Sequence, residues 1–150
     1  MRIFLSSDHA GFELKNSLRE HLVHHGLKKV EDLGPSTLNP NDDYPQFTYR
    51  LTTKLLGSTD KDPRGIMVCG SGQGMCIAAN RVRGIRAALV WNEEVAKDSR
   101  QDNDSNVLCL PARFLDTETA YRIADTWLKE PFSGAARHKR RLDEIEELYG

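Results

Sequence analysis

The chain has 150 residues, of which 39% are hydrophobic and 29% are charged, and its formal net charge is −1. This length and composition predict one globular domain over residues 1–150, with enough apolar side chains to build a core. So small a net charge excludes the broad positive field typical of nucleic-acid-binding proteins, and we expect no nucleic-acid partner. One local basic cluster, Arg137–Arg141, suits a small anion better than a polymer.

The first residues and the cysteines bear on the compartment. Met1–His9 is predicted as a strand that runs directly into polar residues, without the apolar region of a signal peptide, and no apolar run is long enough to span a bilayer. The three cysteines, Cys69, Cys76 and Cys109, lack C-x-x-C spacing, which argues against a disulfide framework and a zinc site. Cys76 is expected on the inner side of its helix, and no second cysteine lies at a recognisable spacing to form a disulfide with Cys69. We therefore do not expect thiol redox chemistry. We expect a cytoplasmic protein without membrane contact, metal or other cofactor.

Strands and helices alternate along the chain. Apolar runs predict strands at Arg2–Ser7, Lys28–Leu33, Gly65–Cys69, Ile85–Val90 and Val107–Leu110. Helical spacing predicts helices at Gly11–His25, Gln46–Leu56, Glu93–Arg100, Thr117–Lys129 and Arg137–Tyr149, with another after the glycines at 70–74. The alternation predicts a single-domain α/β fold of Rossmann-like or flavodoxin-like type, with an open, mostly parallel five-stranded sheet flanked by helices.

Two of these elements carry further expectations. Strand Ile85–Val90 is almost continuously apolar, which is typical of a strand covered by helices on both faces. The last helix is highly charged and has only a narrow apolar stripe of Leu142, Ile145 and Leu148. Because such a stripe on a terminal helix often forms a subunit contact, we expect this helix to contribute to a dimer.

The most informative stretch is Ile66–Arg81, where an apolar strand, a turn with glycine at every second residue and an Ala-rich helix follow one another. Such a unit presents an anion site at the carboxyl end of a parallel sheet. Gly70, Gly72 and Gly74 are expected to adopt positive φ angles and to let a ligand approach the backbone, so that several N–H groups converge on one oxygen.

Cys69 ends the strand beside these glycines. A thiol near a helix N-terminus and a cluster of N–H dipoles has its thiolate favoured, which makes Cys69 a candidate base or nucleophile. The alternative is that Cys69 is simply a small buried apolar residue. The pattern also differs from the dinucleotide fingerprint G-x-G-x-x-G, although Glu93 lies where a ribose-binding acid would be expected, so a nucleotide-binding module stays open.

Other polar residues follow the predicted strands on the same side of the sheet. Asp8 and His9 come after the first strand, and Arg113 comes after the fifth. Because the carboxyl ends of parallel strands meet at one edge, these residues should gather with Cys69 and the glycine loop. Taken alone, Asp8 would cap the following helix and His9 would be an ordinary loop histidine.

Several separated motifs resemble those of one family. They are Ser7–Gly11, Asp43–Pro45, Cys69–Gly74, Ile77–Arg81, Ser99–Gln101 with Asn103 and Asp104, Arg113, and Arg137–His138 with Arg141. In this order they resemble the type B ribose-5-phosphate isomerases and the related galactose-6-phosphate isomerase subunits over nearly the whole chain. The resemblance implies an aldose-ketose isomerase that moves a proton between C1 and C2 of a sugar phosphate through a cis-enediolate.

The resemblance also implies roles for residues of the glycine loop. Cys69 matches the base that moves the carbon-bound proton, and Ser71 matches the residue that relays a proton between O1 and O2. The amides of Gly70–Gly74 would hold the developing oxyanion. Another branch of the family has a glutamate at the position of Met75 and lacks the cysteine. Methionine cannot accept a proton, so this chain resembles the cysteine branch.

Substrate contacts and a dimer follow from the same resemblance. The positions that match substrate-binding residues are His9, Tyr44, Asn103, Arg113, Arg137 and Arg141. All of them except Tyr44 and Asn103 match the phosphate site. Arg137 and Arg141 are four residues apart, so they share one helix face and can hold one dianion. Family members are homodimers, some of which pair into tetramers, and a neighbouring subunit completes each active site.

Asp102 departs from the family pattern. The family uses a histidine there, with Asp8, to open the ring of ribose 5-phosphate, and an aspartate with an unperturbed pKa of about 3.9 is a poor acid at neutral pH. Two substrates stay open: ribose 5-phosphate, opened slowly or with help from Asp102, and a tetrose phosphate such as erythrose 4-phosphate, which closes no furanose. A non-catalytic protein that binds a phosphosugar is a third possibility.

Overall fold

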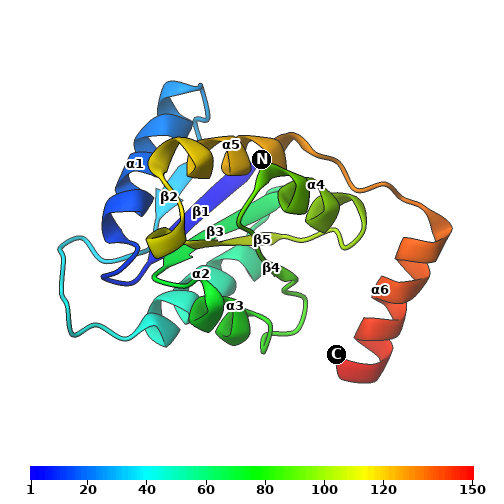
Figure 1. Ribbon diagram of the computed structural model, residues 1–150. Coiled ribbons are helices and arrows are strands. Elements are labelled where there is room, and N and C mark those ends of the chain that lie inside the picture. Colours follow the sequence, from blue (N-terminus) through cyan, green and yellow to red (C-terminus); the bar gives the residue numbers. More distant parts are fainter.

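A five-stranded parallel sheet lies between two layers of helices in the computed structural model, which describes residues 1–150 (Figure 1). The strands are β1 Arg2–Ser7, β2 Val30–Asp32, β3 Pro63–Cys69, β4 Ala87–Leu89 and β5 Val107–Pro111. The helices are α1 Phe12–His24, α2 Tyr44–Leu56, α3 Gln73–Ala79, α4 Glu93–Gln101, α5 Thr117–Lys129 and α6 Ala136–Tyr149, with a short 3₁₀ turn at Ala112–Phe114. The predicted α/β class and parallel sheet are confirmed.

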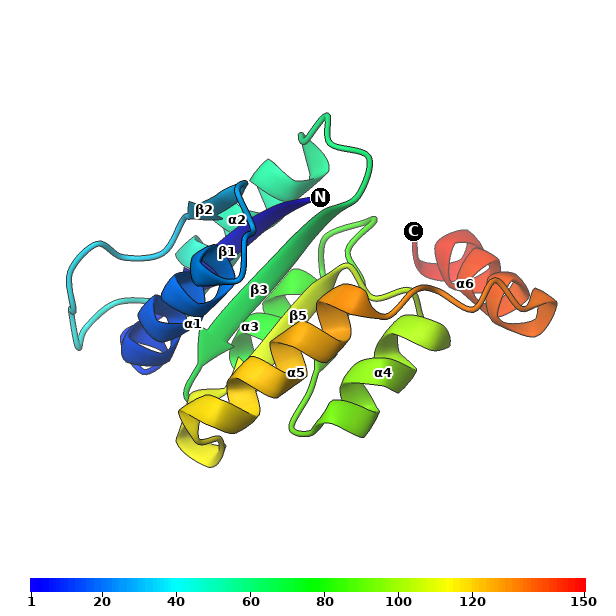
Figure 2. The ribbon, with the colours of Figure 1, turned by 90° about the horizontal axis from the view of Figure 1, so that it is seen from above.

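Side chains of the strands alternate between two apolar clusters. Ile3 and Leu5 of β1 belong to the cluster under α1, α4 and α5, whereas Phe4 belongs to the cluster under α2 and α3. In β3 the same period of two places Met67 and Cys69 with Phe4. Figure 2 shows the two helical layers on opposite faces of the sheet. The Cys69 side chain therefore lies in an apolar environment, on the face of the sheet that α2 and α3 cover.

The strand order β2-β1-β3-β5-β4 creates a switch point between β1 and β3. The chain leaves β1 toward β2 on one side, and the later strands lie on the other side, so the loops after β1 and β3 diverge. In open α/β sheets, ligands bind in the crevice outside the carboxyl ends of such strands. This crevice holds the loop after Ser7 and the glycine loop after Cys69.

The fourth strand differs from its prediction. It extends only over Ala87–Leu89, all three residues are half-buried, and it pairs with β5 alone at one edge of the sheet. As expected, β4 packs against helices on both faces, with Ala88 on the cluster that includes α4 and with Ala87 and Leu89 on the cluster that includes α3. The cover is partial, because the run Ile85–Val90 also borders an open groove. The second strand is also shorter than predicted. Helix α2 begins at Tyr44, before the predicted Gln46, because Pro45 fits the first turn of a helix.

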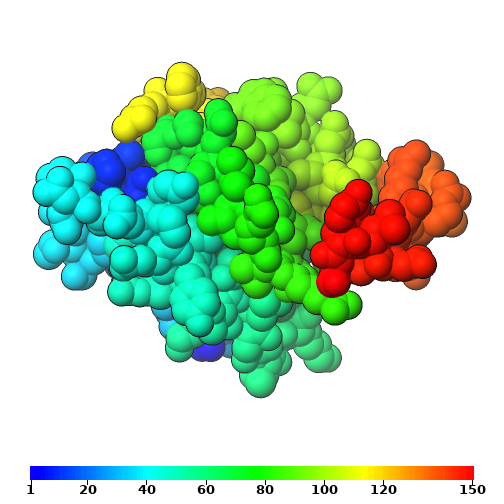
Figure 3. Space-filling view, turned by 90° about the horizontal axis from the view of Figure 1, so that it is seen from below, coloured from blue at the N-terminus to red at the C-terminus, as the bar shows by residue number.

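Helix α6 stands apart from the rest of the chain (Figure 2). His138 is its only buried residue, and Ile145 and Leu148 of the predicted apolar stripe are 47% and 64% exposed. In the space-filling view (Figure 3), α6 lies in red at one side of the molecule, beside a green segment. Arg83 and Glu146 form an ion pair at 3.8 Å. None of the helices combines the length and apolar character needed to cross a bilayer.

Candidate active site

A cavity of about 190 Å³ opens at the carboxyl ends of β1 and β3. Its lining residues are Asp8, His9, Ala10, Tyr44, Cys69, Gly70, Ser71, Gly74 and Arg113. They come from the loop after β1, the first turn of α2, the glycine loop and the 3₁₀ turn after β5. All of them except Ala10 are residues that the sequence singled out. No group of three or more His, Cys, Asp or Glu side chains in the chain is arranged to hold a metal ion.

Cys69 ends β3 with its side chain only 5% exposed. Burial raises the pKa of the Cys69 thiol above its ordinary value, and the nearby Asp8 carboxylate acts in the same direction. Backbone N–H groups of Met75, Gly72 and Gly74 lower this pKa without outweighing the burial. The predicted cluster of amides is therefore present, but the expectation that it favours the thiolate in the free chain is wrong, because the sulfur lies among apolar side chains.

The three glycines of the loop have different reasons to be glycine. Only Gly72 has a positive φ, of 73°, so the expectation of positive φ at Gly70 and Gly74 is wrong. A Cβ on Gly70 would lie 2.8 Å from the Arg113 guanidinium carbon, and a Cβ on Gly74 would lie 2.8 Å from the Tyr44 ring. Gly70 and Gly74 thus make room for two side chains of the cavity.

Arg113 is fixed to the glycine loop through its backbone. Its N–H donates to the Gly70 carbonyl at 3.0 Å, and the 3₁₀ turn Ala112–Phe114 holds it directly after β5. Because Gly70 has no side chain, the Arg113 guanidinium fits against it and lines the cavity. A planar guanidinium is suited to bind the oxygens of a phosphate.

Asp8 and Ser71 both line the cavity. The Asp8 carboxylate accepts a hydrogen bond from the Gly11 N–H at 3.0 Å, so this residue stabilises the start of α1 and also faces the cavity. The Ser71 hydroxyl accepts from the Gln73 N–H at 3.4 Å, a long contact that leaves its proton free for another acceptor.

His9 contacts a residue that sequence reasoning missed. Asp42 accepts a hydrogen bond from the His9 backbone N–H at 3.0 Å, and its Oδ1 lies 2.7 Å from the ring Nδ1. Asp42 belongs to the polar loop before α2, where neither a strand end nor a helical period marked it as a site residue. The only available signal was a second acid beside Asp43, which is too common in loops to indicate a function.

Five of the predicted site residues do not line this cavity: Gly72 is buried within the glycine loop, and the other four lie away from the loop. Asp102 and Asn103 follow α4 and lie toward the amino ends of the strands, whereas Cys69 lies at the carboxyl ends. Arg137 and Arg141 are exposed on α6. The Arg137 Nε–H donates to His138 Nε2 at 3.0 Å, and the same ring nitrogen lies 3.4 Å from Asp102 Oδ1. Arg137, His138 and Asp102 thus form a second polar group at the base of α6, while Asn103 lines the groove beside β4. The single chain does not bring these residues to Cys69.

The remaining candidates have ordinary surroundings. Glu93 pairs with Arg122 at 2.9 Å and does not line the cavity, which removes the main argument for a nucleotide-binding module. Cys76 is half-buried, and its thiol lies 3.5 Å from the Ala87 carbonyl on the inner side of α3, as expected. The Cys109 thiol hydrogen-bonds to Cys76 and lowers its pKa, so the two thiols are neighbours despite their separation in the sequence.

Together these features define an α/β protein with a thiol, an amide-lined loop and an arginine at the switch point of its sheet. The family model described as Ribose/Galactose Isomerase matches residues 3–145 of the chain. The chain therefore belongs to the ribose/galactose isomerase family.

Curated relatives and solved structures agree with this assignment. The chain is 46% identical over 143 residues to the probable ribose-5-phosphate isomerase B of Mycoplasma genitalium, covering 95% of this chain and 92% of the relative. It is 40% identical over 147 residues to ribose-5-phosphate isomerase B of Mycolicibacterium paratuberculosis, covering 98% and 91%.

Two crystal structures are similar over almost their full lengths. Ribose-5-phosphate isomerase B of Mycoplasma genitalium with bound ribulose-5-phosphate has a TM-score of 0.91 at 44% identity, covering 97% of this chain and 94% of that one. The enzyme of Thermotoga maritima has a TM-score of 0.92 at 42% identity, covering 98% of both chains.

Proposed function

We propose that the chain interconverts ribose 5-phosphate and ribulose 5-phosphate, with Cys69 as the base that carries the proton between C2 and C1. The observation that supports this most is the cavity that places the Cys69 thiol beside the amides of the glycine loop. The bound ribulose-5-phosphate of the Mycoplasma genitalium relative supports the choice of sugar.

The reaction needs two proton movements. The Cys69 thiolate removes the proton from C2 of the open-chain aldose and returns it to C1, so that the carbon-bound hydrogen moves by one carbon. The Ser71 hydroxyl relays the O2 proton to O1, which leaves a carbonyl at C2 and a hydroxyl at C1. The amides of Gly72, Gly74 and Met75 face the sulfur in the free protein and offer hydrogen bonds to the negative charge as it develops. No electrons enter or leave.

The phosphate binds to His9 and Arg113, which line the same cavity and provide the donors of this chain. A phosphate dianion carries more charge than one arginine compensates, and Arg137 and Arg141 on α6 form no ion pair in the single chain. We assign Arg137 and Arg141 of a second copy, together with its Asp102 and Asn103, to the completion of the site.

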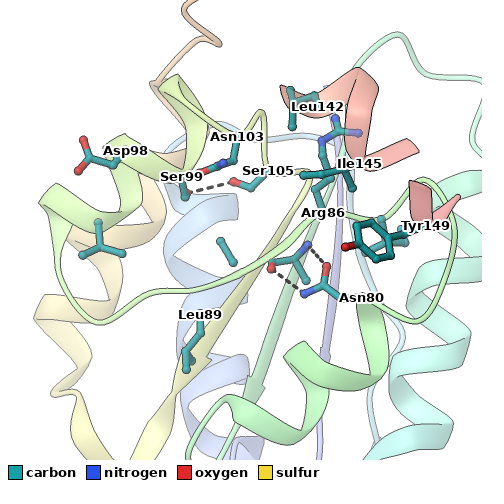
Figure 4. A pocket seen from close by; sticks show the side chains of 14 residues that line it. Asn80, Arg86, Leu89, Asp98, Ser99, Asn103, Ser105, Leu142, Ile145 and Tyr149 are labelled. Carbon is teal, nitrogen blue, oxygen red and sulfur yellow. Dashed lines mark hydrogen bonds between the residues drawn. The ribbon is translucent and has the colours of Figure 1, made fainter. Parts of the chain in front are cut away.

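A homodimer accounts for the groove between α6 and the edge of the sheet. This cavity, of about 570 Å³, is lined by apolar side chains that include Leu89, Val95, Leu142, Ile145 and Tyr149 (Figure 4). An open apolar groove beside an edge strand is a typical subunit contact. A second copy that covers it would bury the half-exposed β4 and bring the end of α6 near the neighbouring sheet. Pairing of two dimers into a tetramer is compatible with the exposed Trp91 and Phe114.

The three cysteines are all free, which fits an enzyme of the cytoplasm.

The proposal is tested by Cys69→Ala. This variant should lose roughly 10²–10⁴-fold in kcat for ribose 5-phosphate, because general base catalysis contributes about that much. In D₂O the wild-type protein should place deuterium on C1 of ribulose 5-phosphate, and Cys69→Ala should not. Cys76→Ala, which removes a thiol outside the cavity, is the matched control. Unchanged turnover in Cys69→Ala, or no isomerisation by the wild type, would refute the proposal.

A tetrose phosphate is a second candidate because of Asp102. If ring opening limits the reaction, Asp102→His should increase turnover of ribose 5-phosphate and leave erythrose 4-phosphate unaffected. Faster turnover of erythrose 4-phosphate than of ribose 5-phosphate by the wild-type protein would instead favour the tetrose. A protein that binds ribose 5-phosphate but exchanges no C2 proton would be a sensor rather than an isomerase.

A further inference from the structure

We infer that Asp42 is a positioning residue that fixes the His9 ring for the substrate phosphate, an inference that rests on the proposed function. Asp42 does not line the cavity, and its effect would pass through the imidazole. It lies in the loop between β2 and α2, and this loop contains none of the predicted site residues; the next one along the chain is Tyr44, which begins α2.

The contacts of Asp42 determine which ring nitrogen of His9 faces the substrate. One carboxylate oxygen, Oδ1, accepts from the His9 backbone N–H at 3.0 Å and lies 2.7 Å from the ring Nδ1. An ionised carboxylate only accepts hydrogen bonds, so Nδ1 carries a proton and Nε2 is the atom left for the ligand. Nε2 makes no hydrogen bond within the chain, while the His9 side chain lines the cavity and is 35% exposed.

The burial of Asp42 indicates that its carboxylate has a role beyond holding a loop. Its side chain is 7% exposed, and its second oxygen, Oδ2, is buried without any partner. The same loop leaves Leu38 58% exposed, so apolar burial does not organise it. A buried carboxylate oxygen without a donor is costly, and an asparagine or serine could anchor the loop at lower cost. The negative charge of the buried Asp42 carboxylate is therefore the feature that needs a functional explanation.

A phosphate ligand supplies that reason. To donate to a phosphate oxygen through Nε2 while Nδ1 also keeps its proton, the ring must carry a positive charge, and the Asp42 carboxylate balances it at 2.7 Å. The other titratable or charged groups around His9 in the cavity are Asp8, Tyr44, Cys69 and Arg113. Of these, Arg113 is the only other cation, so correct orientation of His9 decides how many donors this chain offers to the phosphate.

The test compares three variants of the full-length protein. Asp42→Ala should raise KM for ribose 5-phosphate by roughly tenfold and change kcat by less than about threefold, because the phosphate lies away from C1 and C2. Asp42→Asn keeps the acceptor and removes the charge, so its KM should lie between that of Asp42→Ala and the wild type. Asp43→Asn removes the next carboxylate, which is exposed and makes no side-chain hydrogen bond, and should match the wild type.

Nitrogen NMR of the His9 ring provides a readout that a purely structural role would not change. At a fixed neutral pH, the wild-type and Asp42→Asn rings should have Nδ1 protonated, and the Asp42→Ala ring should shift toward the tautomer protonated on Nε2. A wild-type KM in Asp42→Ala, or a loss confined to thermal stability with unchanged ring nitrogens, would overturn the inference.

The two proposals can fail separately. If the wild type does not isomerise ribose 5-phosphate, the proposed function fails, and inorganic phosphate replaces the sugar as the probe. Asp42→Ala should then still bind inorganic phosphate roughly tenfold more weakly than the wild type. The phosphate-induced shift of the His9 ring nitrogens measures this affinity. If the wild type is active but the Asp42 variants bind like it, only the role of Asp42 is refuted.

Discussion

The sulfur of Cys69 is subject to two opposing influences. Burial among the apolar side chains between β3 and α2 raises its pKa, while three backbone N–H groups lower it, and burial has the larger effect. A raised pKa means that the thiol is protonated at neutral pH and that the thiolate fraction grows as the pH rises. A chemical base built in this way becomes more effective in alkaline solution.

We therefore expect kcat/KM for ribose 5-phosphate to increase with pH, by up to about tenfold per unit between about pH 7 and about pH 9. The reason is that kcat/KM reports the ionisation of the free protein, in which the pKa of Cys69 lies above its ordinary value of 9.0. Initial rates in buffers of constant ionic strength measure the slope. A plateau that is reached below neutral pH would contradict this assignment of the base.

Alkylation should separate the three cysteines by their surroundings. Cys76 is half-buried and has a lowered pKa, Cys69 is 5% exposed with a raised pKa, and Cys109 is fully buried. Because the thiolate is the reactive form, iodoacetamide should label Cys76 first, Cys69 later and Cys109 only after unfolding. Peptide mass spectrometry over a time course gives the order, and first labelling at Cys69 would contradict it. Inactivation assays of Cys69 should accordingly use the Cys76→Ala variant.

The close contact of α1 with β3 depends on one glycine. A Cβ on Gly11 would lie 2.1 Å from the Val68 carbonyl oxygen, which is a backbone atom that cannot move aside cheaply. Gly11→Ala should thus lower the free energy of unfolding by about 3 kcal/mol or more. Gly26→Ala is the control, since Gly26 has a φ of 90° but no atom within 4 Å of its Cβ, and should cost only about 1 kcal/mol. Urea unfolding of both variants decides, and equal losses would contradict the role of Gly11.

Sequence patterns predicted the elements well where side chains bury within one chain. The helix before Gly26 and the strand before Gly70 have regular apolar periods, and both lie close to the predicted ranges. The apolar run Ile85–Val90 correctly indicated cover on both faces of the strand, but its pattern could not show that this cover is partial and that the strand borders an open groove. The glycine at position 70 was misjudged because close packing of Arg113, which is far away in sequence, cannot be read from local spacing.

The candidate site was predictable to the extent that parallel strands end at a common edge. This rule placed Asp8, His9, Cys69 and Arg113 together, and the cavity contains all four. It could not indicate Asp42, whose loop belongs to no strand end. Nor could the residues alone assign positions 102, 137 and 141, which came from the resemblance and lie away from the cavity in the single chain.

At the scale of the whole molecule, a mixing experiment tests the proposed division of the site between two copies. Cys69→Ala and Arg141→Ala should each be nearly inactive alone. In a symmetric dimer with shared sites, a mixed dimer has one site with both changes and one site with neither. Equal amounts of the two variants, unfolded and refolded together, should thus recover about one quarter of wild-type activity. No recovery, although mixed dimers form, would mean that each site belongs to one chain.

One imidazole anchors the start of α6 to its own chain. His138 is the single buried side chain of that helix, and its ring lies 3.3 Å from the Gln101 carbonyl and 3.4 Å from Asp102 Oδ1 at the end of α4. In the proposed dimer, a helix with so little cover in its own subunit would gain its order from assembly. Dilution would then act as an off switch that melts the arm bearing Arg137 and Arg141 while the sheet and its thiol persist, so that catalytic competence follows protein concentration rather than the melting of the core.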